Sequence, residues 1–275
     1  MKKIAIQGVA GAFHELAAYN FFGKNIEPVA CETFRLECQL LTAGKVDFAM
    51  MAIENTIAGT LLPNYALFNE FKMKIVGELY LHIQMHLLTL QGVGFEQLEY
   101  VFSHHIAIEQ CREYLNALPP HITIVEKYDT AASAQLIAEQ GLTNTAAVAG
   151  SMAAEMYGLS YLEKNIQTHK QNFTRFLVLS TQPDENQENN KASLCFELMH
   201  RSGSLAEVLT IFAQHNINLT KIQSVPIIGK PYQYWFYVDV EWTDTQAYNE
   251  ALHLVMKHVA SCAVLGEYRH GKIYD

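Results

Sequence analysis

The sequence is poor in charge and lacks any cluster of basic residues. Charged residues make up 17% of the 275 positions, the formal net charge is −9, and the longest basic run is the pair Lys2 and Lys3. Nucleic acids and anionic membrane surfaces are bound through basic patches. We therefore expect neither as a partner, whereas a small anionic ligand needs only a local site.

Long apolar runs and paired cysteines are also absent. No apolar window reaches the 18 residues of a membrane span, and the apolar stretch at residues 4–6 is too short for a signal peptide. The cysteine count is odd and contains no C-x-x-C pair, which argues against a disulfide framework or a thiolate zinc site. We expect a cytoplasmic protein with reduced thiols at Cys31, Cys38, Cys111, Cys195 and Cys262.

Half of the residues are hydrophobic, which is typical of a compact protein, and the length allows two domains. One composition break divides them, because residues 181–193 hold almost nothing apolar between two strongly apolar runs. The sequence therefore predicts a large domain at residues 1–180, a linker at 181–190 and a small domain at 191–275.

The small domain follows the order strand, helix, strand, strand, helix, strand. Apolar residues alternate over 192–199, which predicts a strand, and a capping box at Ser204 and Glu207 begins a helix that stops at Asn216. Two strands near 219–225 and 234–242 follow, then a second helix over 248–259 and a last strand near 262–268. This βαββαβ order is the ferredoxin-like arrangement.

The first 180 residues alternate short strands with helices, so we expect an α/β fold with largely parallel pairing. The predicted strands are 3–7, 26–31, 47–53, 75–78, 82–89, 100–102, 122–126 and 146–149. The predicted helices are 13–22, 33–43, 65–71, 106–118, 130–140 and 151–156.

Ligands bind at the ends of strands in an α/β sheet, and four polar segments lie there: three follow predicted strands, and the fourth stands just before the apolar residues 177–179. They are Gly8–Gly11, Glu54–Thr56, Ser103–Gln110 and Asn172–Phe176. Each also has an ordinary structural explanation: a tight turn, a helix cap, a cap with a surface glutamine, and an arginine at the start of a strand. Taken singly, spacing favours those structural explanations.

Twelve histidines raise the question of a metal site. His82 and His86 lie in one predicted strand without a carboxylate, and no H-E-x-x-H pattern is present. We therefore expect no metal.

Taken together, the motifs resemble those of the prephenate dehydratase family. The matching segments, in the family's order and spacing, are 8–13, 52–59, Ser103-His104 with Gln110-Cys111, 129–132, 157–159 and 172–176. Segments 201–206 and 217–222 resemble the ACT regulatory domain that is fused to these enzymes. The resemblance covers nearly the whole chain except the linker.

The resemblance implies a catalytic domain of two lobes, like a type II periplasmic-binding protein, with the active site in the cleft. The lobes would be residues 1–76 with 160–180, and 77–159. The implied reaction converts prephenate to phenylpyruvate, water and carbon dioxide in phenylalanine synthesis without a cofactor. ACT domains pair between subunits, so a homodimer or homotetramer is expected, with L-phenylalanine as allosteric effector.

The resemblance also implies the site residues. Thr174 matches the family's essential threonine, and Arg175 matches the arginine linked to substrate binding. The catalytic set would be Thr174, Glu54 and Asn55, and the substrate-binding set would be Arg175, Gly11, Thr56, Ser103, Gln110, Thr130, Asn172 and Phe176. The effector set would be Gly203, Ser204, Leu205, Asn218, Leu219, Gln223 and Ser224.

Chemistry suggests roles for these residues. Prephenate carries two carboxylates and a ring hydroxyl, and it becomes aromatic when hydroxide and carbon dioxide leave. Arg175 and the backbone N–H groups near Gly11 would hold carboxylates, and Thr174 would donate a hydrogen bond to the departing hydroxyl. Glu54 is the nearby motif residue able to donate a proton, if burial raises its pKa.

The chain departs from the family pattern in the first loop, at His105-Ile106, at Gln167-Thr168 and in the ACT part. Val9, Ala12 and His14 replace residues of the first loop and remove two hydroxyl groups. Residues 223–226 lose both charges of the motif that contacts phenylalanine in relatives, which affects the expected strength of inhibition. Two alternatives stay open: an arogenate dehydratase, whose substrate has an amino group in place of the keto oxygen, and a non-catalytic amino-acid sensor.

Overall fold

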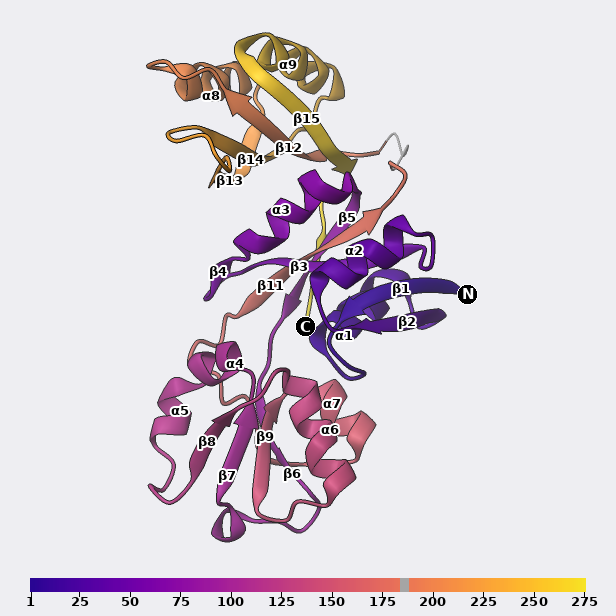
Figure 1. The fold of residues 1–275 in the computed structure, drawn as a ribbon, viewed down its shortest axis with the longest axis vertical. Coiled ribbons are helices and arrows are strands. Elements are labelled where there is room, and N and C mark those ends of the chain that lie inside the picture. Colours follow the sequence, from indigo (N-terminus) through magenta and orange to yellow (C-terminus); the bar gives the residue numbers. More distant parts are fainter. Residues whose placement is uncertain (184–187) are drawn as a thin grey trace. The chain divides into compact units, whose positions relative to one another are not determined.

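The computed structural model describes residues 1–183 and 188–275 (Figure 1), and these divide into two compact units. Unit 1 holds residues 1–64, 79–177 and 273–275, and unit 2 holds residues 65–78 and 178–272. The units differ from the expected domains because residues 65–78 cluster with the C-terminal part of the chain. Of the expected linker at 181–190, residues 184–187 lie outside the described part.

The first sheet has the strand order β16-β5-β11-β3-β1-β2, and β4 pairs with β3. Strand β1 pairs in parallel with both β2 and β3. Nearly every residue of β3 and β11 is at least half-buried, as expected for central strands covered on both faces. The strands are β1 Lys2–Gln7, β2 Ile26–Cys31, β3 Phe48–Asn55, β4 Gly59–Thr60, β5 Lys74–His82, β11 Phe173–Ser180 and β16 Lys272–Tyr274.

Three helices accompany this sheet: α1 Phe13–Phe22, α2 Phe34–Thr42 and α3 Leu62–Phe71. Helix α2 begins one residue after its predicted start, because Thr33 is its N-cap and accepts a hydrogen bond from the N–H of Leu36 at 3.2 Å. Helix α1 begins as predicted, but its N-cap residue, Ala12, offers no side chain to its first N–H groups. The first backbone N–H groups of α1 are therefore available to donate hydrogen bonds to another acceptor.

The second sheet lies within unit 1 and has the order β10-β6-β9-β7-β8. Its helix α6 is capped at its start by Asp129 and at its end by the left-handed Gly141. The strands are β6 His86–Thr89, β7 Tyr100–Ser103, β8 Thr123–Glu126, β9 Thr145–Ala149 and β10 Ser160–Glu163. The helices are η1 Phe95–Gln97, α4 His105–Gln110, α5 Arg112–Asn116, α6 Thr130–Gln140 and α7 Ser151–Tyr157.

The structure moves both expected lobe boundaries. Strand β5 continues in the first sheet to His82, so the crossing comes later than residue 77. Strand β10 pairs antiparallel with β6, which places residues 160–163 in the second sheet. The strand predicted over 82–89 begins only at His86, because His82 is the last residue of β5. The helix predicted over 106–118 is interrupted at Cys111 and forms the two short helices α4 and α5.

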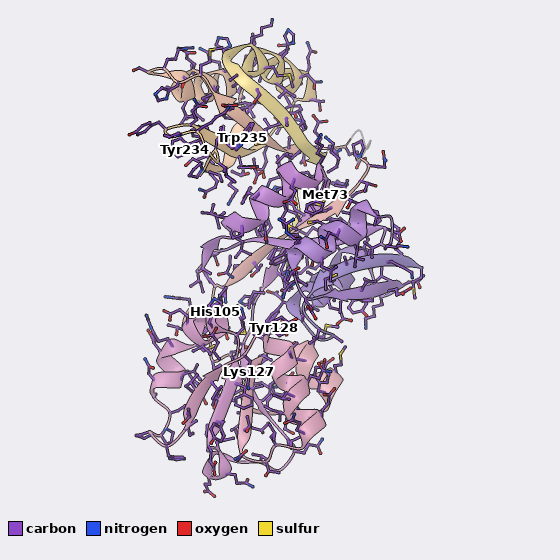
Figure 2. The ribbon with its side chains drawn as sticks, in the orientation of Figure 1. Met73, His105, Lys127, Tyr128, Tyr234 and Trp235 are labelled. Carbon is purple, nitrogen blue, oxygen red and sulfur yellow. The ribbon has the colours of Figure 1, made fainter. Side chains whose placement is uncertain are left out.

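Unit 2 contains the ferredoxin-like βαββαβ arrangement that the sequence predicts. Its sheet has the order β13-β14-β12-β15, with every pairing antiparallel. Tyr234 and Trp235 lie at the start of β14 (Figure 2). The elements are β12 Lys191–Leu198, α8 Ser204–Gln214, β13 Asn218–Pro226, β14 Tyr234–Glu241, α9 Thr245–His258 and β15 Val259–Tyr268.

The predicted capping box of α8 does not form. Gly203, with a φ of +83°, is the N-cap residue, and Ser204 is the first residue of the helix. Glu207 pairs instead with Arg201, whose Nη1 lies 2.6 Å from Glu207 Oε1. The predicted stop is confirmed, because Asn216 has a φ of +56° just after the helix.

Unit 2 contains a cluster of charged side chains, of which Lys191 and Glu78 are buried, Glu241 is half-buried and His270 is exposed. Lys191 Nζ lies 2.8 Å from Glu78 Oε1 and 3.0 Å from Glu241 Oε1, and His270 Nδ1 lies 2.7 Å from Glu241. Lys191 and Glu78 are nearly inaccessible to solvent. Although burial acts to raise it, the pKa of Glu241 is lowered overall by Lys191 and His270. Glu78, Glu241 and His270 have the proximity of metal ligands, but the Lys191 ammonium already bonds both carboxylates.

Candidate active site

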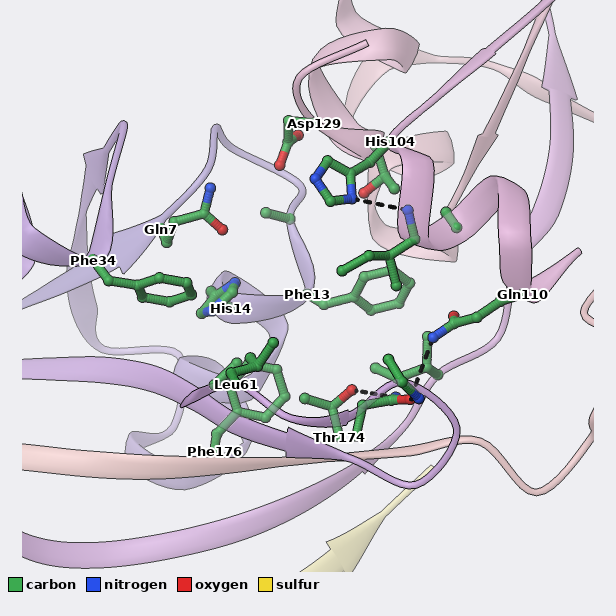
Figure 3. Close-up of a pocket in the computed structure, with 18 of the residues that line it drawn as sticks. Gln7, Phe13, His14, Phe34, Leu61, His104, Gln110, Asp129, Thr174 and Phe176 are labelled. Atoms are coloured by element: carbon green, nitrogen blue, oxygen red, sulfur yellow. Dashed lines mark hydrogen bonds between the residues drawn. The ribbon is translucent and has the colours of Figure 1, made fainter. Parts of the chain in front are cut away.

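A cavity of about 410 Å³ opens in unit 1, at the carboxyl ends of strands β1 and β3 and the beginnings of several helices (Figure 3). This is where an α/β sheet binds ligands. The first sheet gives it Gln7, Ala52, Asn55, Thr174 and Phe176. The beginnings of α1, α2, α4 and α6 provide Phe13, His14, Phe34, Ile106 and Thr130.

One wall of the cavity is a closed network of uncharged hydrogen bonds around Asn55. Asn55 Nδ2 donates to Asn172 Oδ1 at 2.7 Å and to Thr174 Oγ1 at 3.0 Å. Asn172 Nδ2 donates to Gln110 Oε1 at 3.0 Å, and Gln110 Nε2 donates back to Asn55 Oδ1 at 3.3 Å. Three segments far apart in the sequence are thereby joined.

The turn after β3 determines how this network is oriented. Asn55 Oδ1 accepts hydrogen bonds from the backbone N–H groups of Ile57 and Ala58, at 2.9 and 2.8 Å. The Asn55 amide nitrogen must therefore point toward Thr174. Because the Thr174 oxygen accepts that hydrogen bond, its own proton is available to a ligand in the cavity.

An aromatic corner, made of His14, Phe34 and Phe176, forms a different wall of the same cavity (Figure 3). The His14 ring centroid lies 5.4 Å from that of Phe34 and 5.0 Å from that of Phe176, edge to face. Burial lowers the pKa of His14 to about 3, so its imidazole is neutral at ordinary pH. His14 Nε2 is enclosed and has no hydrogen-bond partner among the described residues.

Two further polar residues of the cavity, Asp129 and His104, cap helices. Asp129 caps α6 by accepting from the N–H of Ala132 at 2.8 Å, and burial raises its pKa. His104 caps α4 through Nδ1, which accepts from the N–H of Ile106 at 3.3 Å, and burial lowers its pKa. Among the residues that the structure describes, no Lys or Arg lines the cavity. Negative charge on a ligand must therefore be met by N–H groups and helix dipoles.

Most of the expected site residues come together. Asn55, Gln110, Thr130, Thr174 and Phe176 line the cavity. Asn172 is fully buried behind it and holds Asn55 and Gln110 in place. Residues predicted from four separate motifs thus meet in one site.

Arg175 and Glu54 do not line the cavity. Thr174 and Phe176 both face it, so the side chain between them on the strand points the other way. Arg175 is buried there, with its guanidinium 5.9 Å from the centre of the Tyr80 ring. Glu54 lies in the antiparallel pairing of β3 with β4, opposite Thr60. The expected roles of carboxylate holder and proton donor in this cavity are therefore not supported.

Three other expected contacts are already used inside the protein. The N–H of Gly11 donates to Glu15 Oε2 at 2.6 Å, and Ser103 Oγ donates to the Val148 carbonyl at 2.7 Å. Thr56 Oγ1 accepts from the N–H of Phe173 and belongs to a separate surface depression with residues 168–171. The cap of α4 is His104 rather than Ser103.

Sequence reasoning missed part of the site. His14 stood out only as a departure from the family pattern, and Asp129 only as part of the segment 129–132. The apolar lining has no sequence signal of its own, because its members come from different elements of the fold. It includes Phe34, Leu61, Ile83 and Met85.

The expected effector residues in unit 2 are divided between two faces. Gly203 and Ser204 lie at the start of α8, with Ser204 buried and Leu205 half-buried. Along β13, Leu219 and Gln223 are half-buried, whereas Asn218 and Ser224 are exposed. Because side chains alternate along a strand, these two pairs face opposite sides of the sheet.

Two further observations bear on the sequence predictions. All five cysteines are free thiols, and four of them are buried. Within residues 1–183 and 188–275, no helix has the length and apolar character needed to cross a membrane.

Comparison with known proteins places this geometry in context. A family model described as prephenate dehydratase matches residues 4–184, and one described as ACT domain matches residues 194–241. Arogenate dehydratase/prephenate dehydratase 2 of Arabidopsis thaliana, a chloroplastic protein, is 38% identical over 97% of this chain and 72% of its own length.

Two solved structures superimpose with a TM-score of 0.87. One is prephenate dehydratase from Arthrobacter aurescens in complex with L-Phe, 25% identical, covering 98% of this chain and 90% of that one. The other is GqqA, described as a novel type of quorum quenching acylase, 28% identical and covering 98% of both chains.

Proposed function

The chain belongs to the prephenate dehydratase family, whose reaction is the decarboxylating dehydration of prephenate to phenylpyruvate, and we propose that the cavity of Figure 3 is where this reaction occurs. The observation that carries the proposal is the oriented hydroxyl of Thr174. It is held by Asn55 at 3.0 Å, and Asn55 is in turn held by two backbone N–H groups.

The reaction needs little from the enzyme beyond orientation. When the C1–carboxylate bond breaks, its electron pair moves into the ring and carbon dioxide is released. The bond from C4 to the hydroxyl oxygen breaks with its pair on the oxygen, which leaves as hydroxide and takes a proton from solvent after release. Thr174 donates a hydrogen bond to that oxygen as negative charge develops on it. A donor that is already oriented stabilises this charge without rearrangement during the reaction.

The cavity also suits the loss of carbon dioxide. Its apolar lining excludes water from the carboxylate that leaves, and a poorly solvated carboxylate decarboxylates more readily. The carboxylate that stays on the product is held by backbone N–H groups at helix starts. The start of α1 is suited to this because no side chain caps its first N–H groups. This arrangement replaces the role first expected of Arg175 and of the N–H of Gly11.

Dehydration fits the site better than acyl transfer, the activity for which GqqA is described. A threonine nucleophile needs a neighbouring base to take its proton. In the described structure, the recorded partner of Thr174 Oγ1 is the Asn55 amide, which is a donor.

We also propose that L-phenylalanine inhibits the enzyme through the ACT part of the chain and that the protein is a homodimer or homotetramer. The L-Phe complex of the Arthrobacter aurescens relative supports the first. Exposed apolar residues at Ile222, Ile228, Tyr232 and Tyr234 support an association of subunits around β13 and β14. The free thiols support the cytoplasm as the compartment.

One assay tests the function. Phenylpyruvate formation from prephenate and phenylalanine formation from arogenate are measured separately; the prephenate assay is repeated with added L-phenylalanine. We expect prephenate turnover well above the spontaneous rate, and inhibition by L-phenylalanine. Turnover of arogenate alone would identify an arogenate dehydratase, and turnover of neither would favour a sensor. Light scattering on the same sample gives the number of subunits.

A further inference from the structure

His14 is the polar residue of the aromatic corner, and the family resemblance gives it no role. Its imidazole lines the cavity beside Phe34 and Phe176 (Figure 3). Neither ring nitrogen has a recorded hydrogen bond, and Nε2 is enclosed without a partner in the described structure. Buried polar atoms without partners are rare in proteins, so this arrangement needs a reason.

The enclosure of Nε2 determines what the ring offers to a ligand. A buried N–H without an acceptor is less common than a buried acceptor without a donor. A neutral imidazole carries one proton, which therefore belongs on Nδ1. That leaves Nδ1–H as the hydrogen-bond donor that His14 can direct at a ligand in the cavity.

The position of His14 indicates which part of the substrate it meets; this step rests on the proposed function. In Figure 3, His14 and Phe34 lie at one end of the cavity, while Thr174 and Gln110 lie toward the other. Prephenate has its hydroxyl at C4, and both of its acidic groups are on C1, directly across the ring. If Thr174 holds the C4 hydroxyl, the C1 end extends toward His14.

We propose that His14 donates a hydrogen bond to the C1 side chain of the substrate and thereby favours a keto acid over an amino acid. The acceptor that distinguishes the two substrates is the keto oxygen of prephenate, because the side-chain carboxylate is common to both. Arogenate has an ammonium group in place of the keto oxygen, and an ammonium group cannot accept one. His14 is thus a specificity-determining residue for the keto-acid side chain.

The test compares His14→Leu and His14→Gln with the wild type on both substrates. In His14→Leu we expect kcat/KM for prephenate to fall about tenfold, because one hydrogen bond to the keto-acid side chain is lost. The change should be in KM, because the side chain is the same before and after the reaction. The fall for arogenate should be smaller. His14→Gln keeps an N–H donor and should recover part of the loss.

Controls separate this proposal from its alternatives. His121→Leu, at an exposed histidine outside the cavity, should change neither substrate's kcat/KM. The inhibition constant of phenylpyruvate, which keeps the keto-acid side chain, should rise in His14→Leu by the same factor as KM. Equal falls for both substrates, or an unchanged inhibition constant, would overturn the assignment. A wild type that uses neither substrate would instead overturn the proposed function.

Discussion

The protein contains two polar clusters with buried members, and they are built on opposite plans. The cluster in unit 1 joins Asn55, Gln110, Asn172 and Thr174, carries no charge and opens onto a cavity. The cluster in unit 2 joins Lys191, Glu78, Glu241 and His270, and the Lys191 ammonium bonds both carboxylates. The first leaves a hydroxyl proton for a ligand, whereas in the second each carboxylate is already paired. Polar groups therefore form part of the candidate ligand site in unit 1, whereas in unit 2 they stabilise the fold.

The largest effect should come from removing the central cation of the unit 2 cluster. Lys191→Met leaves the buried Glu78 and the half-buried Glu241 without their cation, which should lower the free energy of unfolding by about 3–5 kcal/mol. The measurement is urea denaturation, with turnover of the folded enzyme assayed alongside. Turnover should be nearly unchanged, because the cluster is structural.

A matched lysine provides the control. Lys230 pairs with Glu197 at 3.1 Å but is half exposed, so Lys230→Met should cost less than about 1 kcal/mol. Equal losses in the two variants would contradict the distinction between a buried charged support and a surface pair.

The next effect concerns catalysis and the cluster in unit 1. Thr174→Ala removes the oriented donor, and turnover of prephenate should fall by about 10²–10³-fold, as when one preorganised donor is lost. The unfolding midpoint should stay near that of the wild type. Thr123→Ala, at an exposed threonine outside the cavity, is the control. Near-normal turnover in Thr174→Ala would remove this residue from the mechanism.

A moderate effect should follow from opening the same network from behind. Asn172→Ala leaves Asn55 and Gln110 each without one partner, and an unsatisfied buried group costs about 1–3 kcal/mol of stability. Both the unfolding free energy and kcat should fall, because the network supports the fold and orients Thr174. A fall in stability with unchanged kcat would show that Asn172 has no part in orienting Thr174.

The smallest effect, taken over a single pH unit, is a pH dependence of stability from His14. The folded protein holds the pKa of His14 near 3, whereas the unfolded chain takes up this proton below about 6.5. The free energy of unfolding should therefore decrease as the pH falls from 6.5 toward 3, by roughly 1 kcal/mol over the first pH unit below 6.5. His14→Leu should lose less stability than the wild type over this range in urea titrations. Parallel curves would indicate that His14 is accessible to solvent.

The sequence predicted the elements better than the side chains that face the cavity. Helices at 13–22 and 130–140 and the strand at 26–31 were predicted with their observed bounds, and the ferredoxin-like order of unit 2 was also correct. Their periodicity and capping residues are local, so a sequence displays them directly.

The site residues show where sequence reasoning ends. Thr174 and Arg175 are neighbours in one motif, yet only the fold decides that Thr174 faces the cavity and Arg175 faces away. Gly11 and Ser103 match the family's positions, but Glu15 and the Val148 carbonyl bond them internally. The partners of a polar group are fixed by tertiary structure, which one-dimensional spacing does not contain.

We propose that the cavity of unit 1 holds the substrate with its C4 end at Thr174. A crystal structure of the enzyme with phenylpyruvate tests this orientation directly. We expect the product's ring in the cavity, with C4 nearest Thr174 and the keto-acid side chain toward His14. Phenylpyruvate bound in the surface depression beside Thr56, or in the reverse orientation, would contradict it.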